Sequence, residues 1–169
     1  MIKKVLLCLC ACACSLVDVS ADEKMNREQT ITKALDGIES AKPKQKRKIL
    51  VFSLTRGFRH KSISTGKIAM RLLGETTGAY EAVISDDLAN FEPGKIYDFD
   101  AICFLNTTME VFSPHNGAMK KMTDEEKKKA NEREARLKKS LMEYIKSGKG
   151  FIGIHAATDT FYKWPEYGE

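Results

Sequence analysis

The sequence Lys48-Ile-Leu-Val-Phe-Ser53 decides the fold, because it is a continuous apolar run of strand length. Such a run is typical of a central parallel strand that is covered on both faces. The polar turn Thr55–Lys61 follows it, and in Ser62–Thr77 the apolar residues then recur at helical spacing. This order predicts a strand, a loop and a helix, which form the first unit of a parallel sheet.

The same alternation continues along the chain. Three further strands are expected at Tyr80–Ser85, Phe99–Leu105 and Gly150–Ile154. Segment 86–98 is expected to be a loop with one short turn, and segment 106–122 an irregular loop without an element. Strands that alternate with helices predict an α/β domain with a parallel sheet and helices on both of its faces.

The last helix is signalled by its first residues. Thr123-Asp-Glu-Glu126 has the form of a capping box, and an apolar stripe then continues to a stop at Gly148. The first half of this helix is highly charged, so we expect it to project into solvent beyond the sheet. The alternative is an arm that interacts with a partner.

The N-terminus resembles a secretory signal peptide. Two lysines precede the uncharged, mostly apolar stretch Val5–Val17, and small residues follow at Val19-Ser20-Ala21. The apolar stretch is shorter than the roughly 20 residues that cross a bilayer. We therefore expect cleavage after residue 21 and a secreted or periplasmic bacterial protein. The alternative is a lipoprotein tethered to the membrane through a lipidated Cys12.

Cleavage would also remove four of the five cysteines and leave only Cys103, which lies in an expected buried strand. No internal disulfide can then form, and we expect this thiol to be inert packing. Segment 22–47 is charged and contains Pro43 between lysines, so it is expected to be a lead-in and linker. Segment 48–169 is then a single domain.

The formal net charge of +5 is modest, and the lysines of segment 120–139 are mixed with acidic residues. This pattern favours a solubilising face and does not indicate a nucleic-acid partner. The oligomeric state is not indicated by any pattern in the sequence.

Polar side chains follow three of the expected strands. In parallel sheets, ligands bind beyond the carboxyl ends of the strands, near the point where the strand order reverses. The loops after the first, third and fourth strands are therefore expected to converge. They contain Arg56, Arg59 and His60; Asn106 and Thr107; and His155, Thr158 and Asp159.

Each of these residue types suits a different task. His60 and His155 are candidates for general acid and base, and Asp159 for orienting His155 or a substrate hydroxyl. The two arginines suit an oxygen-rich or anionic group. The remaining three, Asn106, Thr107 and Thr158, suit sugar hydroxyls.

These residues also have structural interpretations. His60 can cap the following helix. Asparagine and threonine stabilise turns, and an acid is favoured near the start of a helix, where Asp159 is expected.

The stretch Gly153-Ile-His-Ala-Ala157 resembles a nucleophile elbow, in which small neighbours permit a tight turn after a strand. The elbow position holds histidine, so no serine or cysteine nucleophile is expected there. A metal site formed by His60, His115 and His155 is a weaker alternative, because no two ligands are closely spaced. We assign no metal and no cofactor. The aromatic residues Tyr162 and Trp164 suit either stacking on a sugar ring or core packing.

Three blocks of sequence together resemble the trehalose-utilisation (ThuA-like) family. They are Ile49–Ser62, Phe99–Thr108 and Gly148–Phe161, and the resemblance covers residues 48–169. It implies a class I glutamine amidotransferase-like fold, which is a flavodoxin-like three-layer sandwich, and a role in carbohydrate catabolism. In amidotransferases the elbow carries a cysteine. Because this chain has His155 there, glutaminase activity is not expected.

The resemblance also implies further strands beyond the Trp164-Pro-Glu-Tyr-Gly168 stretch. We therefore expect the sheet to be incomplete at the C-terminus, with an exposed apolar edge. The leading hypothesis is a sugar-active enzyme that uses histidine acid and base chemistry on trehalose, a related sugar or an oxidised sugar. The alternatives are a non-catalytic sugar-binding or partner module and, more weakly, a metal-dependent hydrolase.

Overall fold

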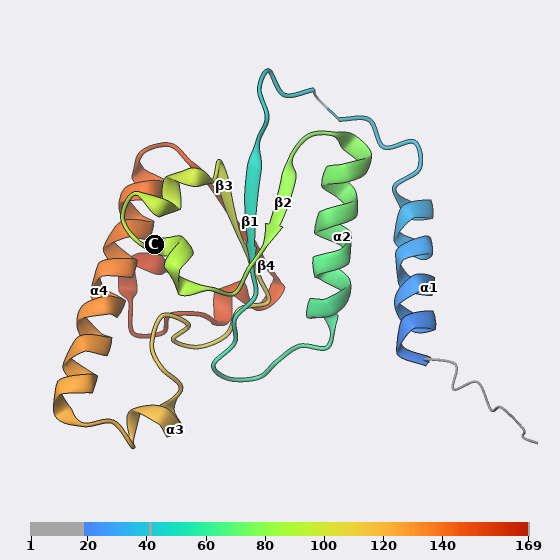
Figure 1. Cartoon of the computed structure of the whole chain (residues 1–169). Coiled ribbons are helices and arrows are strands. Elements are labelled where there is room, and N and C mark those ends of the chain that lie inside the picture. Colours follow the sequence, from blue (N-terminus) through green and yellow to red (C-terminus); the bar gives the residue numbers. More distant parts are fainter. Residues whose placement is uncertain (1–18, 41, 169) are drawn as a thin grey trace, which may run out of the picture.

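Four parallel strands form the centre of the molecule, with helices on both faces (Figure 1). The computed structural model describes residues 19–40 and 42–168. The strands lie in the order β2-β1-β3-β4. Their bounds are β1 (Lys48–Phe52), β2 (Glu81–Ile84), β3 (Ala101–Leu105) and β4 (Gly150–Ile154). The expected α/β fold with a parallel sheet is confirmed, and the strand order is that of a flavodoxin-like sandwich.

The two faces of the sheet differ in what covers them. Helix α2 (Ser62–Thr77) packs on one face, and α1 (Val19–Ala34) lies outside α2 (Figure 1). Helix α4 (Asp124–Lys146) covers the opposite face together with the short 3-10 turns Leu88–Phe91 and Lys95–Asp98. Successive strand residues point to opposite faces, so a fully apolar strand such as β1 supplies both layers of the core.

The larger part of the core lies between the sheet and α4 and is rich in aromatic rings. It contains Phe52 and Phe104 from the strands, and Leu141 and Tyr144 from the helix, all fully buried. The smaller part, under α2, consists of Val51, Cys103 and Leu105. Burial raises the pKa of the Cys103 thiol to about 11, so this cysteine is the inert packing residue that the sequence predicted.

Helix α4 begins as its sequence predicts. The side chain of Thr123 accepts a hydrogen bond from the backbone of Glu126, and the carboxylate of Glu126 accepts one from the backbone of Thr123. The first turns, with their charged residues, extend past the carboxyl ends of the strands (Figure 1). The second half buries Leu137 and Leu141 against the sheet.

Two of the expected loops contain more structure than their sequences indicate. Segment 86–98 forms two 3-10 turns instead of one. Segment 106–122 contains the four-residue helix α3 (Asn116–Met119), which His115 caps by accepting a hydrogen bond from the Gly117 amide. The reason is local: Asp87 and His115 use their side chains to bind backbone N–H groups, and apolar periodicity does not record this kind of turn.

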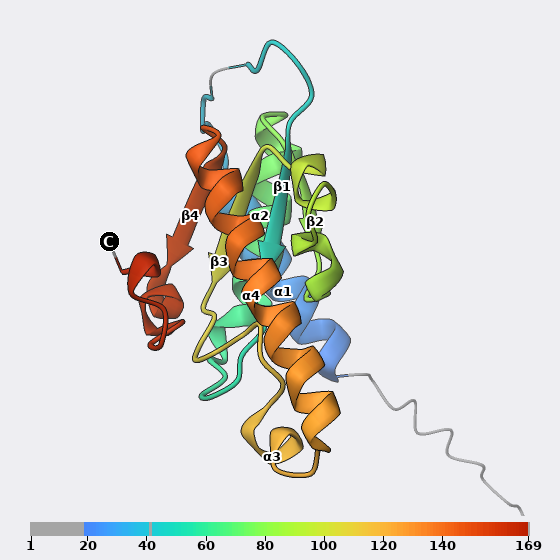
Figure 2. The same ribbon diagram turned by 90° about the vertical axis from the view of Figure 1, so that its left-hand side faces the viewer.

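Strand β4 lies at the edge of the sheet, beside the C-terminal turns (Figure 2). Its outer residue Ile152 is 37% exposed, so an apolar side chain is open on this strand, as expected. The signal peptide core and Cys12 lie outside the described residues. Among the described helices, none combines the length and apolarity that a membrane crossing requires.

Candidate functional site

Two site candidates stand directly at the carboxyl ends of neighbouring strands. Asn106 follows β3 and His155 follows β4, and the Asn106 amide donates a hydrogen bond to the Ile154 carbonyl. Both residues have positive φ angles, 54° and 51°. A left-handed conformation turns the chain sharply away from the strand, so both side chains are placed at the end of the sheet.

The structure brings His60 and His155 into contact. Their ring centroids are 4.7 Å apart in an edge-to-face arrangement, and Phe58 stands 4.8 Å from His60 in the same way. Within residues 19–40 and 42–168, neither imidazole has a hydrogen-bond or ion-pair partner. The ring nitrogens are therefore free to bind a ligand or to transfer a proton.

A hollow of about 330 Å³, called here the histidine hollow, opens between α2 and the ends of β3 and β4. It is lined by Ser62, Thr65, Gly66, Ala69, Leu105, Asn106, Ile154 and His155. The absence of a side chain at position 66 matters, because a Cβ atom there would come within 2.9 Å of the Leu105 side chain. Glycine thus lets α2 approach β3 closely and form one wall of the hollow.

Asn106 is almost completely buried at the floor of this hollow. Its side-chain amide nitrogen donates to the hydroxyl of Ser62 over 2.8 Å. Among the residues that the structure describes, the amide oxygen has no hydrogen-bond partner, although it is buried. A buried acceptor without a donor is costly, and a ligand hydroxyl that donates to it would remove that cost.

The turn at His155 has the strained geometry of an elbow. The residue combines a positive φ with a position between β4 and the 3-10 turn His155–Asp159. The neighbouring residues are small for a steric reason, since a Cβ atom on Gly153 would lie 3.3 Å from that of Ala157. The elbow geometry that Gly153–Ala157 resembles is therefore present, with an imidazole in place of a nucleophile.

Three further candidates do not line the histidine hollow. The hydroxyl of Thr107 is fully buried and paired with that of Thr160 at 2.8 Å, so it ties β3 to the C-terminal segment instead of facing a ligand. The hydroxyl of Thr158 donates to the His155 carbonyl at 3.4 Å and lines a separate hollow beside Tyr167. The side chain of Asp159 makes no hydrogen bond to His155 in the described chain.

The two arginines of the first loop are also separated from each other. Arg56 lies on the α4 side, where its Nε atom donates to the Ser113 carbonyl over 2.7 Å. Arg59 is exposed next to His60. The structure therefore does not bring the two arginines together, because the loop turns between them.

The third histidine is not part of this site. His115 caps α3, and no group of three or more histidine, cysteine or acidic side chains in the described chain is arranged to hold a metal ion. The aromatic candidates also divide: Trp164 belongs to the core at 9% exposure, whereas Tyr162 is exposed.

Two contributors were missed from the sequence. Phe58 packs on His60, and Ser62 binds the Asn106 amide. Ser62 could have been predicted from the sequence, because the first residue of a helix that follows a loop at the carboxyl edge of the sheet faces the expected cleft. The arrangement as a whole provides two free imidazoles, an unpaired amide oxygen and the apolar side chains of Leu105 and Ile154.

A family model described as ThuA, trehalose utilisation, matches residues 48–169. The match begins at the first residue of β1 and includes every residue of the histidine hollow. No curated protein matches the chain significantly, and no solved structure does.

Proposed function

Because the chain belongs to the ThuA family of trehalose utilisation, we propose that its α/β domain binds a sugar or an oxidised sugar in the histidine hollow. His60 and His155 then share the acid and base steps of the reaction. The observation behind this proposal is the contact between the two imidazoles beside the unpaired amide oxygen of Asn106.

The contact between the rings suits proton transfer in both directions. A neutral imidazole removes a proton from a sugar hydroxyl or from a carbon beside a carbonyl group, and a protonated imidazole supplies one to the oxygen that gains charge. Groups on two different loops can reach two different atoms of one substrate. Such positioned acid and base groups each contribute about 100-fold to 10,000-fold in rate.

The rest of the hollow matches the surface of a sugar. Asn106 lines the hollow, and a rotation of its side chain would let its buried oxygen accept a hydroxyl hydrogen, while Leu105 and Ile154 offer apolar contact to C–H groups. Helix α2 starts beside the hollow without a side-chain cap and without an acidic residue in its first turn. The positive end of the helix dipole therefore favours an oxygen-rich group. Arg59, exposed beside His60, would approach the substrate from the solvent side.

The test uses the three histidines of the chain as a matched set. His60→Ala and His155→Ala are expected to lower turnover of the active sugar by about 100-fold or more, whereas His115→Ala leaves it unchanged. The assay screens trehalose, glucose and their ketone and carboxylate oxidation products with the full chain. Equal activity of all three variants would overturn the proposal.

A non-catalytic sugar-binding module is the second candidate. It is favoured by the histidine at the elbow, which replaces the serine or cysteine nucleophile, and by the lack of an orienting partner for either ring in the described chain. Calorimetry that detects sugar binding without any product would select this function. Metal analysis of protein purified without a histidine tag tests the hydrolase alternative.

We also propose that the protein is exported, on the basis of the charged start, the apolar stretch and the small residues before Asp22. N-terminal sequencing of protein from the periplasm or the medium is expected to begin at Asp22. A lipid-modified N-terminus at Cys12 would instead select the lipoprotein. A mature protein that begins at Met1 would contradict both.

A further inference from the structure

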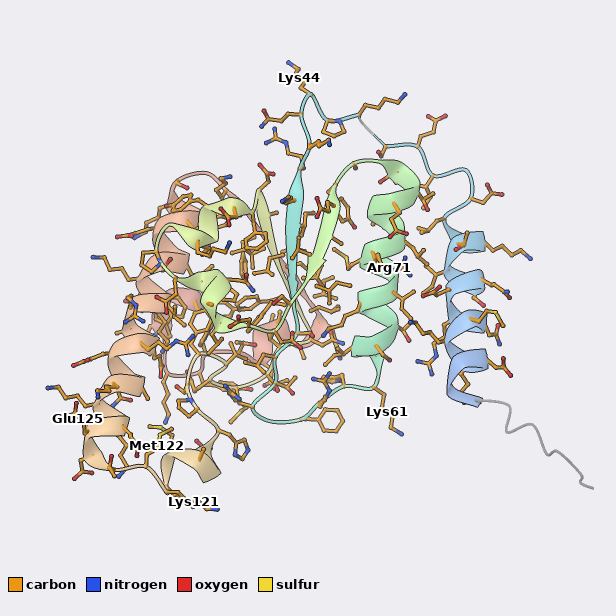
Figure 3. All side chains as sticks on the ribbon, in the orientation of Figure 1. Lys44, Lys61, Arg71, Lys121, Met122 and Glu125 are labelled. Atoms are coloured by element: carbon orange, nitrogen blue, oxygen red, sulfur yellow. The ribbon has the colours of Figure 1, made fainter. Side chains whose placement is uncertain are left out.

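A second hollow, of about 360 Å³, lies at the same end of the sheet but on the α4 side. We call it the arginine hollow. It is lined by Arg56, Leu88, Phe112, Pro114, Met122, Lys129, Ala130 and Arg133. Figure 3 shows the separation of the two sides: Met122 lies beside the start of α4, whereas Lys61, the neighbour of His60, lies at the start of α2.

Arg56 is held in place by its own loop and by the loop opposite. Its backbone N–H donates to the Thr108 carbonyl at 2.9 Å, and its Nε donates to the Ser113 carbonyl at 2.7 Å. The side chain is half-buried, and burial lowers the pKa of its guanidinium group. In the described chain the guanidinium has no carboxylate partner. Burial weakens the hydration of a cation, so an anion that binds this guanidinium would replace part of the lost hydration.

Two more cations line the same hollow from α4. Lys129 contacts Glu125 at 3.4 Å, and Arg133 contacts Glu92 at 3.6 Å, so within the described part of the chain each has one long and partly exposed ion pair. Glu92 has a stronger partner in Arg136, at 2.7 Å. Such exposed pairs contribute little, and the lining residues include three cations and no carboxylate. The arginine hollow therefore has an excess of positive charge.

The remaining lining is mostly apolar. Phe112 is 2% exposed and forms part of the aromatic core, and Pro114 and Met122 come from the irregular loop before α4. Apolar walls with a few fixed polar groups are typical of small-molecule sites, and the volume is within their range. Apolar surroundings also strengthen the attraction between a guanidinium group and an anion, because water screens it less.

From this combination we propose that the arginine hollow binds a small organic anion, a carboxylate or a phosphate ester that carries an apolar or aromatic portion. The anionic group contacts Arg56, with Lys129 and Arg133 at the rim, and the apolar portion lies against Phe112, Pro114 and Met122. This site is separate from the histidine hollow and does not depend on the function proposed for it.

Phenyl phosphate and benzoate are suitable probes, titrated into the full chain and followed by calorimetry and by backbone amide NMR shifts. Inorganic phosphate tests the charge alone, and benzyl alcohol tests the ring alone. Phenyl phosphate is expected to bind about 10-fold more tightly than inorganic phosphate, because the ring is buried as well. The shifts are expected around Phe112 and Ala130, and not around Ser62 and Asn106.

Charge-removing variants then identify the binding residues. Arg56→Gln is expected to weaken phenyl phosphate binding about 10-fold or more, since hydrogen bonds to charged groups are strong. Lys129→Gln is expected to weaken it several-fold, whereas Lys128→Gln, the exposed neighbour on α4, serves as the matched control and has no effect. If Arg56→Gln does not fold, the comparison of Lys129→Gln with Lys128→Gln still decides the question.

Three results would overturn the proposal. The first is that neither phenyl phosphate nor benzoate binds at millimolar concentration. The second is equal weakening by Lys129→Gln and Lys128→Gln, which would mean a diffuse response to net charge. The third is a set of NMR shifts confined to the histidine hollow.

Discussion

The nine-residue loop 53–61 contributes to two regions at the carboxyl end of the sheet that differ in chemistry. Arg56 lines the hollow on the α4 side, and His60 contacts His155 on the α2 side. The arginine hollow has three cations over an aromatic floor, whereas the histidine hollow has a neutral polar floor in Asn106. Residues close together in a loop can therefore belong to different sites, because the loop crosses the edge of the sheet.

The largest effect is expected when one variant of each hollow is tested both for sugar turnover and for phenyl phosphate affinity. His155→Ala is expected to lower sugar turnover by about 100-fold or more and to leave phenyl phosphate affinity unchanged. Arg56→Gln is expected to weaken phenyl phosphate binding and to leave sugar turnover unchanged. Steady-state kinetics and calorimetry on both variants measure the four values. If each variant lowered both activities equally, the two hollows would act as one site.

The next effect concerns Thr107, which the sequence placed among the ligand-binding residues. Thr107→Val keeps the shape of the side chain but leaves the buried hydroxyl of Thr160 without its partner. This change is expected to lower the free energy of unfolding by about 1–3 kcal/mol, as measured by urea denaturation. The double variant Thr107→Val/Thr160→Val is expected to recover part of the loss. A changed KM for the sugar together with unchanged stability would instead show that Thr107 takes part in ligand binding.

A smaller effect is expected from the backbone at His155, where φ is 51°. Glycine adopts this conformation without strain, so His155→Gly is expected to be more stable than His155→Ala by about 1 kcal/mol. Position 56 has no positive φ, and Arg56→Gly is expected to be less stable than Arg56→Ala. Thermal unfolding of the four variants makes the comparison. Equal stability of the two variants at position 155 would mean that the elbow stores no strain.

The smallest effect concerns Asp86, which pairs with helix α2 beside the histidine hollow, and it changes with pH in the acid range. Burial alone would raise the pKa of Asp86, but hydrogen bonds from Ser53 and the ion pair with Lys67 of α2 hold it below the usual value. A lowered pKa in the folded state gives stability that is present above about pH 4 and is lost as pH falls through the folded-state pKa.

The corresponding variant is Asp86→Asn, which is expected to be less stable than the wild type at pH 7. Its unfolding free energy is also expected to fall less steeply below about pH 4. Urea denaturation across that pH range provides the measurement. Parallel pH profiles of the two proteins would show that Asp86 contributes nothing to the acid sensitivity.

Much of the fold followed from local patterns. Helix Ser62–Thr77 and strand Gly150–Ile154 have the bounds that their sequences predict, and the Thr123 capping box forms as expected. Apolar runs and capping residues act over a few neighbours, so they are visible in a single sequence. One of the two turns in segment 86–98, and helix α3 with its His115 cap, were missed, because side-chain hydrogen bonds to the backbone leave no apolar period.

The candidate site could be predicted from the sequence only in part. The contact between His60 and His155 agrees with the rule that parallel strands present their carboxyl ends at one edge. That rule assigns a loop to an edge, but it does not say which way each side chain turns. The side chain of Thr107 points into the core, where it pairs with Thr160, and the side chain of Arg56 points toward α4, where it donates to the Ser113 carbonyl. The direction of each side chain depends on which neighbour offers a hydrogen bond.

By itself the sequence determined that this protein has a parallel α/β fold, that the first strand starts at Lys48, and that a histidine occupies the elbow after β4. Only the tertiary structure decided which polar residues share a hollow, left the Asn106 oxygen without a partner, and separated Arg56 from His60. The physical reason is distance along the chain. Strand and helix formation depends on nearby residues, whereas a hollow is formed by segments far apart in the sequence, such as Ser62 and Asn106, 44 residues apart, whose side chains meet only after packing.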